Sequence, residues 1–121
     1  MAVLVDTNVW IKHFRNTNPL LGDLLEENEV LCHPVVIGEL SMENLANRDL
    51  VIRDFCALAR PQEASWAETR HLVESRQLYG KGLQWNDVLL LASCIISQVP
   101  LWTLDLRLAR QASLAGIGFA G

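Results

Sequence analysis

Short apolar runs alternate along the chain with longer segments whose apolar positions recur at helical spacing. Fully apolar, β-branched runs are typical of buried parallel strands, and a recurrence every three or four residues indicates a helix with one buried face. The predicted strands span residues 2–5, 30–32 and 100–103, and residues 117–120 are a candidate edge strand. The predicted helices span residues 9–14, 20–27, 35–47, 50–59, 66–79, 88–97 and 106–115.

Local signals support these boundaries. Pro19 suits the first position of a helix, and Gly116 suits the end of one. Ser65 and Glu68 have the spacing of a capping box. Strands alternate with helices, and no linker or repeat interrupts them. We therefore expect residues 1–121 to form one α/β domain, with helices on both faces of a parallel sheet.

The composition describes a folded protein with a modest acidic surplus. Half of the 121 residues are hydrophobic, and 14 acidic residues against 10 basic ones give a net charge of −4. The apolar content excludes a disordered chain, and the negative charge argues against a protein that coats nucleic acid by bulk charge. It does not exclude a local site that handles phosphates through a metal ion.

The chain shows no signal for export or membrane insertion. Asp6 interrupts the apolar N-terminal run at once, which is unlike a signal peptide, and the apolar stretch 88–96 is too short to span a bilayer. Cys32, Cys56 and Cys94 have no CxxC spacing, which favours free thiols over a disulfide or zinc site. We therefore expect a cytoplasmic protein that does not associate with membranes.

Four acidic residues stand at comparable places in the predicted fold. Asp6 and Asp105 follow predicted strands, and Asp87 stands at the start of a buried helix. Glu39 lies within a helix between apolar neighbours, where an acid needs a partner or a site. Because the carboxyl ends of parallel strands share one edge of the sheet, we expect these acids to meet there.

Carboxylates brought together repel one another, and a divalent ion that prefers oxygen ligands removes the repulsion. Mg²⁺ and Mn²⁺ are the ions best suited to such a site. Such an ion can polarise a phosphoryl oxygen and activate a water for attack on a phosphodiester. Each Asp taken alone also has a structural explanation as a turn former, helix cap or first-turn residue. The four together point more strongly to a metal site than any one does.

Four short blocks of the sequence resemble the signature blocks of the PIN domain. They are VDTNVWI at residues 5–11, GEL at 38–40, NDVLLLA at 86–92 and TLD at 103–105. Their order and spacing, over the whole chain, resemble the VapC toxins of bacterial toxin–antitoxin pairs. The resemblance implies a three-layer α/β/α sandwich with a short central parallel sheet, and an Mg²⁺- or Mn²⁺-dependent endoribonuclease.

The resemblance also implies roles for individual residues. It assigns metal binding and catalysis to a quartet of acids, namely Asp6, Glu39, Asp87 and Asp105. Thr103 matches a hydroxyl position that steadies the acids, and Thr7 and Asn8 match the opening motif around Asp6. Glu43 lies beyond the shared pattern, one helical turn after Glu39. We favour a solvated position for Glu43, and membership of the acid cluster stays open.

An RNA substrate needs cationic contacts near these acids. The candidates are Lys12, Arg15, Lys81 and Arg107, with Arg110 as a further one, and each also has an ordinary role in solubility. Trp85, beside Asp87, is a weak candidate for stacking on a base. We expect all four tryptophans to be more often core than interface residues, because tryptophan is highly buried on average.

The resemblance implies two protein partners. One is a VapB-type antitoxin whose basic C-terminal segment lies across the acidic cleft, where an Arg or Lys neutralises the carboxylates. The other is a second copy of the chain in a homodimer, with side chains such as Trp10 or Phe14 as contacts. The leading prediction is thus an endoribonuclease toxin. The alternative is a non-catalytic PIN-like module that binds RNA or protein. Loss of the acids would be its mark in the sequence, and all four acids are present.

Overall fold

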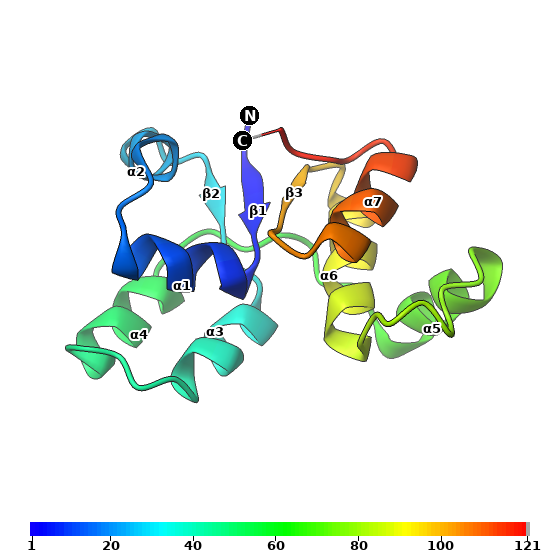
Figure 1. Ribbon diagram of the computed structural model, residues 1–121, viewed down its shortest axis with the longest axis horizontal. Helices are drawn as coiled ribbons and strands as arrows, with labels where there is room; N and C mark the ends of the chain where they lie inside the picture. Colours follow the sequence, from blue (N-terminus) through cyan, green and yellow to red (C-terminus); the bar gives the residue numbers. More distant parts are fainter. Residues whose placement is uncertain (121) are drawn as a thin grey trace.

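Three short parallel strands lie at the centre of the computed structural model, which describes residues 1–120 (Figure 1). They are β1 (Val3–Val5), β2 (Val30–Leu31) and β3 (Leu101–Trp102), and their order in the sheet is β2-β1-β3. In the register of the sheet, Leu4 of β1 lies opposite Leu31 on one side and Leu101 on the other. The central strand β1 is fully buried, as its uninterrupted apolar sequence requires.

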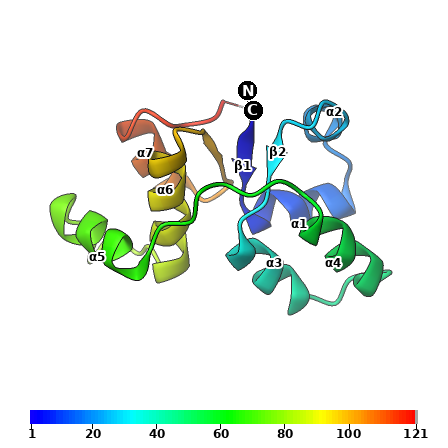
Figure 2. The ribbon, with the colours of Figure 1, turned by 180° about the vertical axis from the view of Figure 1, so that it is seen from behind.

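Seven helices surround the sheet in the described residues. They are α1 (Thr7–Arg15), α2 (Pro19–Glu26), α3 (Pro34–Ser41), α4 (Arg48–Cys56), α5 (Trp66–Ser75), α6 (Trp85–Ser97) and α7 (Leu106–Leu114). In Figure 1, α1 and α7 lie toward the viewer, and the reverse view in Figure 2 brings α4 and α6 forward. The predicted α/β/α arrangement with a parallel sheet is confirmed.

Several predicted boundaries are wrong, and backbone geometry explains them. The helix predicted over 35–47 ends at Ser41, where Met42 is the C-cap, and the left-handed Asn47 with φ 53° is the N-cap of the separate helix α4. The helix predicted to run to residue 79 ends at Ser75, and Gln77 has φ 52°. The candidate edge strand is reduced to one bridge, between Leu101 and Gly118.

The four tryptophans divide into two pairs, which corrects the prediction that all of them are core residues. Trp10 and Trp102 are buried, and the Trp10 ring packs edge-on against Phe55 at 4.5 Å between ring centroids. Trp10 is therefore closed to a contact between subunits, whereas Phe14 is 42% exposed. Trp66 and Trp85 are exposed, and each is the first residue of its helix.

The cysteines match the prediction of free thiols in the described part of the chain. Cys32 and Cys94 are buried, Cys56 is exposed, and none forms a disulfide. Burial raises the pKa of the Cys32 thiol to about 12, so the group is uncharged and unreactive at neutral pH. Within residues 1–120, no helix has both the length and the apolar character needed to cross a membrane.

The buried centre of the sheet predicts a large effect of truncation at Leu4. Leu4→Ala truncates a fully buried side chain of the core on the central strand, and we expect it to lower the free energy of unfolding by about 3 kcal/mol. Leu106→Ala makes the same chemical change at a side chain that is 84% exposed, and should change stability by less than about 0.5 kcal/mol. Urea denaturation of both variants measures the difference, and equal losses would contradict the assignment of the core.

Candidate active site

Asp6 is held in place at the carboxyl end of the central strand. It follows Val5 directly and caps α1, with its Oδ1 accepting a hydrogen bond from the Thr7 amide at 2.7 Å. The Asp6 amide donates to the Trp102 carbonyl at 2.9 Å, which ties the strand end to β3. The side chain is only 6% exposed. The end of β1 thus presents a carboxylate whose backbone and side chain are both fixed.

Thr103 and Asn8 connect this carboxylate to the segment that follows β3. The Thr103 hydroxyl donates to Asp6 Oδ2 at 2.8 Å and accepts a hydrogen bond from the Asp105 amide at 3.1 Å. Asn8 Nδ2 lies 3.3 Å from Asp6 Oδ2 and 3.2 Å from Thr103 Oγ1, and its Oδ1 accepts from the Leu104 amide. The two polar side chains therefore fix the chain after β3 against the chain after β1.

Thr7 connects the same region to α3. Its hydroxyl donates to Glu39 Oε1 at 2.7 Å, although the two residues are 32 positions apart in the sequence. The helix α3 begins at Pro34 after His33, whose Nδ1 caps it by accepting from the Val35 amide. The order of elements thus brings a carboxylate of α3 next to the end of β1.

One cavity of about 530 Å³ gathers most of the candidate residues. Its lining includes three acids of the predicted quartet, namely Asp6, Glu39 and Asp87. Asp87 belongs to the first turn of α6, where its Oδ2 accepts from the Gln84 amide at 2.9 Å. Residues Thr7, Asn8, Lys12, Arg15 and Glu43 also line the cavity. Glu43 is exposed, as we favoured, yet it faces the same space as Glu39.

Asp105 takes a different position. Its Oδ1 caps α7 by accepting from the Arg107 amide at 2.9 Å and lies 3.7 Å from Arg107 Nε, and the residue does not line the cavity. Its backbone is connected to the site through Thr103. In the described residues, no three His, Cys, Asp or Glu side chains lie close enough together to hold a metal ion. The acids surround one region without forming a closed set of ligands.

Only two of the four candidate RNA contacts lie beside the acids of the cavity. Lys12 and Arg15 line the cavity, and neither forms an ion pair within residues 1–120. Lys81 is exposed in the loop between α5 and α6 and lies outside the cavity lining. Arg107 is engaged with Asp105, and its guanidinium lies where a side chain on Gly82 would stand. The structure thus places two cations, Lys12 and Arg15, beside the acids.

The electrostatics of the site centre on Asp6. The pKa of its carboxyl is raised to about 6, chiefly by burial and to a smaller extent by the nearby Glu39 and Asp87, while hydrogen bonds from Thr103 and Thr7 act in the opposite direction. An ionised Asp6 is therefore under electrostatic strain at neutral pH. A bound cation would relieve this strain, because it offsets both the desolvation and the repulsion between carboxylates.

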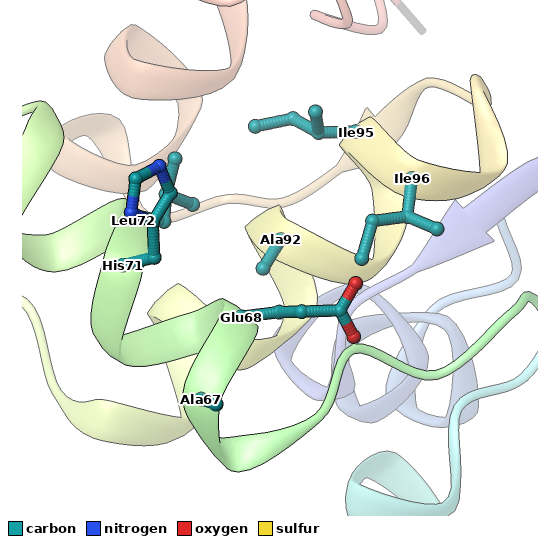
Figure 3. Close-up of a pocket in the computed structure, with 7 residues that line it drawn as sticks. All are labelled: Ala67, Glu68, His71, Leu72, Ala92, Ile95 and Ile96. Atoms are coloured by element: carbon teal, nitrogen blue, oxygen red, sulfur yellow. The ribbon is translucent and has the colours of Figure 1, made fainter.

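A second hollow lies between α5 and α6 and has a different character (Figure 3). Its volume is about 380 Å³, and mainly apolar side chains line it, including Leu72, Ile95 and Ile96. Glu68 is its only carboxylate, and His71 is its only imidazole. The lining does not suit a charged phosphodiester, so the acid-lined cavity is the candidate active site.

Comparisons with known proteins find matches over nearly the whole chain. The family model of the PIN domain matches residues 3–114. Ribonuclease VapC32 of Mycobacterium tuberculosis, from strains CDC 1551 / Oshkosh and ATCC 25618 / H37Rv alike, is 37% identical over 119 residues. The alignment covers 98% of this chain and 96% of the relative. No solved structure gives a significant match.

The raised pKa of Asp6 predicts that its contribution to the stability of the fold falls as the pH rises. The folded protein keeps the Asp6 proton up to pH about 6, whereas the unfolded chain loses it near 3.8, so the contribution of Asp6 falls as pH rises between these values. We expect Asp6→Asn to match wild type near pH 4 and to exceed it by about 2–3 kcal/mol above pH 6. Urea denaturation across this range measures the difference.

Asp23→Asn is the matched control, because Asp23 is exposed on α2. Its difference from wild type should stay within about 0.5 kcal/mol at every pH. An Asp6→Asn protein that is less stable than wild type at pH 7 would contradict the electrostatic strain at Asp6.

Proposed function

The chain belongs to the PIN domain family, and on that premise we propose that it is an endoribonuclease toxin of the VapC type that hydrolyses RNA with the help of Mg²⁺ or Mn²⁺. The observation that carries the proposal is the cavity lined by Asp6, Glu39 and Asp87 at the carboxyl end of the sheet. The full-length similarity to a ribonuclease supports the reaction class.

The donor chemistry of the site fits a hard divalent cation. Carboxylate oxygens are the ligands that Mg²⁺ and Mn²⁺ prefer. Within the described residues, Glu39 Oε2, Asp87 Oδ1 and Asp105 Oδ2 accept no protein hydrogen bond and remain available. The chemistry that such an ion supplies when bound is stabilisation of the phosphate charge and activation of water as a nucleophile.

The residues of the chain have separable tasks in this proposal. Asp6, Glu39 and Asp87 would hold the cation once it draws their carboxylates closer together than they lie in this structure, and Asp105 would join them from the segment after β3. Thr103 is a positioning residue, since its hydroxyl contacts both Asp6 and the backbone of Asp105. Lys12 and Arg15 bind phosphates on either side of the bond that is cut, because their charges face the cavity without an ion-pair partner in residues 1–120.

We also propose the partners that the family resemblance implies. An antitoxin of the VapB type fits the cavity through a basic C-terminal tail, because four carboxylates and only two cations line it. A homodimer in the reducing cytoplasm stays a prediction, and sedimentation of the purified protein measures it. The complete set of acids favours the nuclease over a non-catalytic binding module.

Single substitutions of the site residues test the proposed nuclease activity. Asp6→Asn and Asp87→Asn should abolish cleavage of total RNA in the presence of Mg²⁺ or Mn²⁺, because each removes a charged ligand. Thr103→Val should lower the rate by about 10–100-fold, and Thr103→Ser should retain it, since Ser keeps the hydroxyl. Gel analysis and sequencing of the cleavage sites measure these rates.

Asp23→Asn serves as the active control, and excess EDTA should stop the wild-type reaction. Asp6→Asn separates lost chemistry from lost folding, since we expect it to be more stable than wild type at neutral pH. Equal cleavage by wild type and Asp6→Asn would show that a contaminant cuts the RNA. An inactive wild-type protein that still binds RNA would support the non-catalytic module.

The cations of the cavity predict a change in salt dependence. Lys12→Met and Arg15→Gln should each weaken kcat/KM and reduce the slope of log(kcat/KM) against log salt by about 0.7, the value for one phosphate contact on a single strand. Initial rates on one labelled RNA between low and moderate salt give the slopes. Arg53→Gln on the exposed face of α4 is the control, and a control slope that changes equally would contradict a local role for Lys12 and Arg15.

A further inference from the structure

Two exposed tryptophans lie against each other beside the candidate active site. Trp66 is 69% exposed and Trp85 is 40% exposed, and their ring centroids are 6.2 Å apart with an angle of 35° between the planes. Tryptophan is among the most buried residue types on average, so an exposed pair in contact needs an explanation. Packing of the core does not provide one.

The pair is completed by a cation. The Arg70 guanidinium lies 5.9 Å from the Trp66 ring centroid, and Glu74 holds the same guanidinium through an ion pair of 2.8 Å. Trp66 remains largely exposed despite both neighbours, so part of its ring surface is accessible to a ligand. The cluster therefore combines accessible aromatic surface with a guanidinium that lies over the Trp66 ring.

The position of the pair connects it to the catalytic cavity. Trp85 and Asp87 both belong to the first turn of α6, two residues apart. Two residues correspond to a rotation of about 200° around a helix, so the two side chains leave α6 on different sides. Trp85 faces Trp66, and Asp87 faces the cavity. The first turn of α6 thus carries the aromatic pair on one side and a carboxylate of the cavity on another.

We propose that Trp66 and Trp85 form a stacking platform for an unpaired base of the RNA, outside the cavity that holds the cleaved phosphate. This inference rests on the proposed function, because it extends the binding site of the same substrate. Aromatic faces accept any base, and such stacking is a general mode of single-strand recognition. The platform therefore selects unpaired RNA over duplex RNA, in which the bases are already stacked.

The chemistry of the pair favours RNA over a protein partner. An accessible tryptophan ring offers stacking to an unpaired base, which is a feature of single-strand binding sites, and the Arg70 guanidinium beside it is already paired with Glu74. The apolar hollow between α5 and α6 is lined by other residues, and neither tryptophan belongs to its lining (Figure 3). A second copy of the chain docked on the tryptophans is the competing outcome that the experiment distinguishes.

The test compares two probes in EDTA, so that no phosphodiester is cut. One is labelled oligouridylate, and the other is an abasic ribose-phosphate chain of the same length. Wild type should bind oligouridylate about tenfold more tightly, as expected for base stacking on one aromatic side chain. The double variant Trp66→Ala/Trp85→Ala should lose this preference, and Trp66→Phe/Trp85→Phe should keep most of it. Leu50→Ala, an exposed apolar change on α4, should leave it intact.

Each outcome decides the inference. A preference for oligouridylate that survives the double Ala change would overturn the platform, as would a wild type that shows no preference. A double Ala protein that changes from dimer to monomer in sedimentation with its preference intact would identify a protein interface instead. Cleavage of total RNA by wild type is measured separately. Its absence would reject the proposed nuclease without altering the binding result.

Discussion

The hydrogen bond from Thr103 to Asp6 is the contact on which the geometry of the site depends. It joins the segments that follow two neighbouring parallel strands, and it spans 97 positions of the sequence. The Asp6 carboxylate is in turn fixed by its own cap of α1, and Thr7 extends the network to Glu39 of α3. Because the sheet order β2-β1-β3 places the end of β1 in the middle, one short strand positions groups from three elements.

This arrangement places a charged group where the fold alone would not favour one. Asp6 is buried beside other acids, so its ionised carboxylate is less stable in the folded protein than in water. Hydrogen bonds from Thr103 and Thr7 offset part of this penalty, and they also set the direction of the carboxylate. A site of this kind trades stability for a high affinity toward cations, which is a frequent compromise in catalytic centres.

Much of the fold and part of the site follow from the sequence, because they depend on local patterns. Apolar runs that end in Asp6 and near Asp105 identify both the strands and the edge where ligands bind. Long-range packing determines what the pattern could not predict. Glu43 faces the cavity although its helix ends at Ser41, whereas Asp105 takes the helix-cap role that the local sequence leaves open. Likewise, only the pairing of α5 with α6 brings Trp66 to Trp85.

The distribution of charge explains how an acidic protein can select RNA on the proposed function. Four carboxylates line the cavity together with only Lys12 and Arg15, so long-range attraction of a polyanion is weak. Binding must then rely on short-range contacts, such as phosphates at the two cations and a base on the tryptophan pair. A basic peptide needs none of these contacts, because the carboxylates attract it directly. On the proposed function, an antitoxin tail and an RNA strand would therefore compete for one cavity, and each would draw its affinity from different side chains.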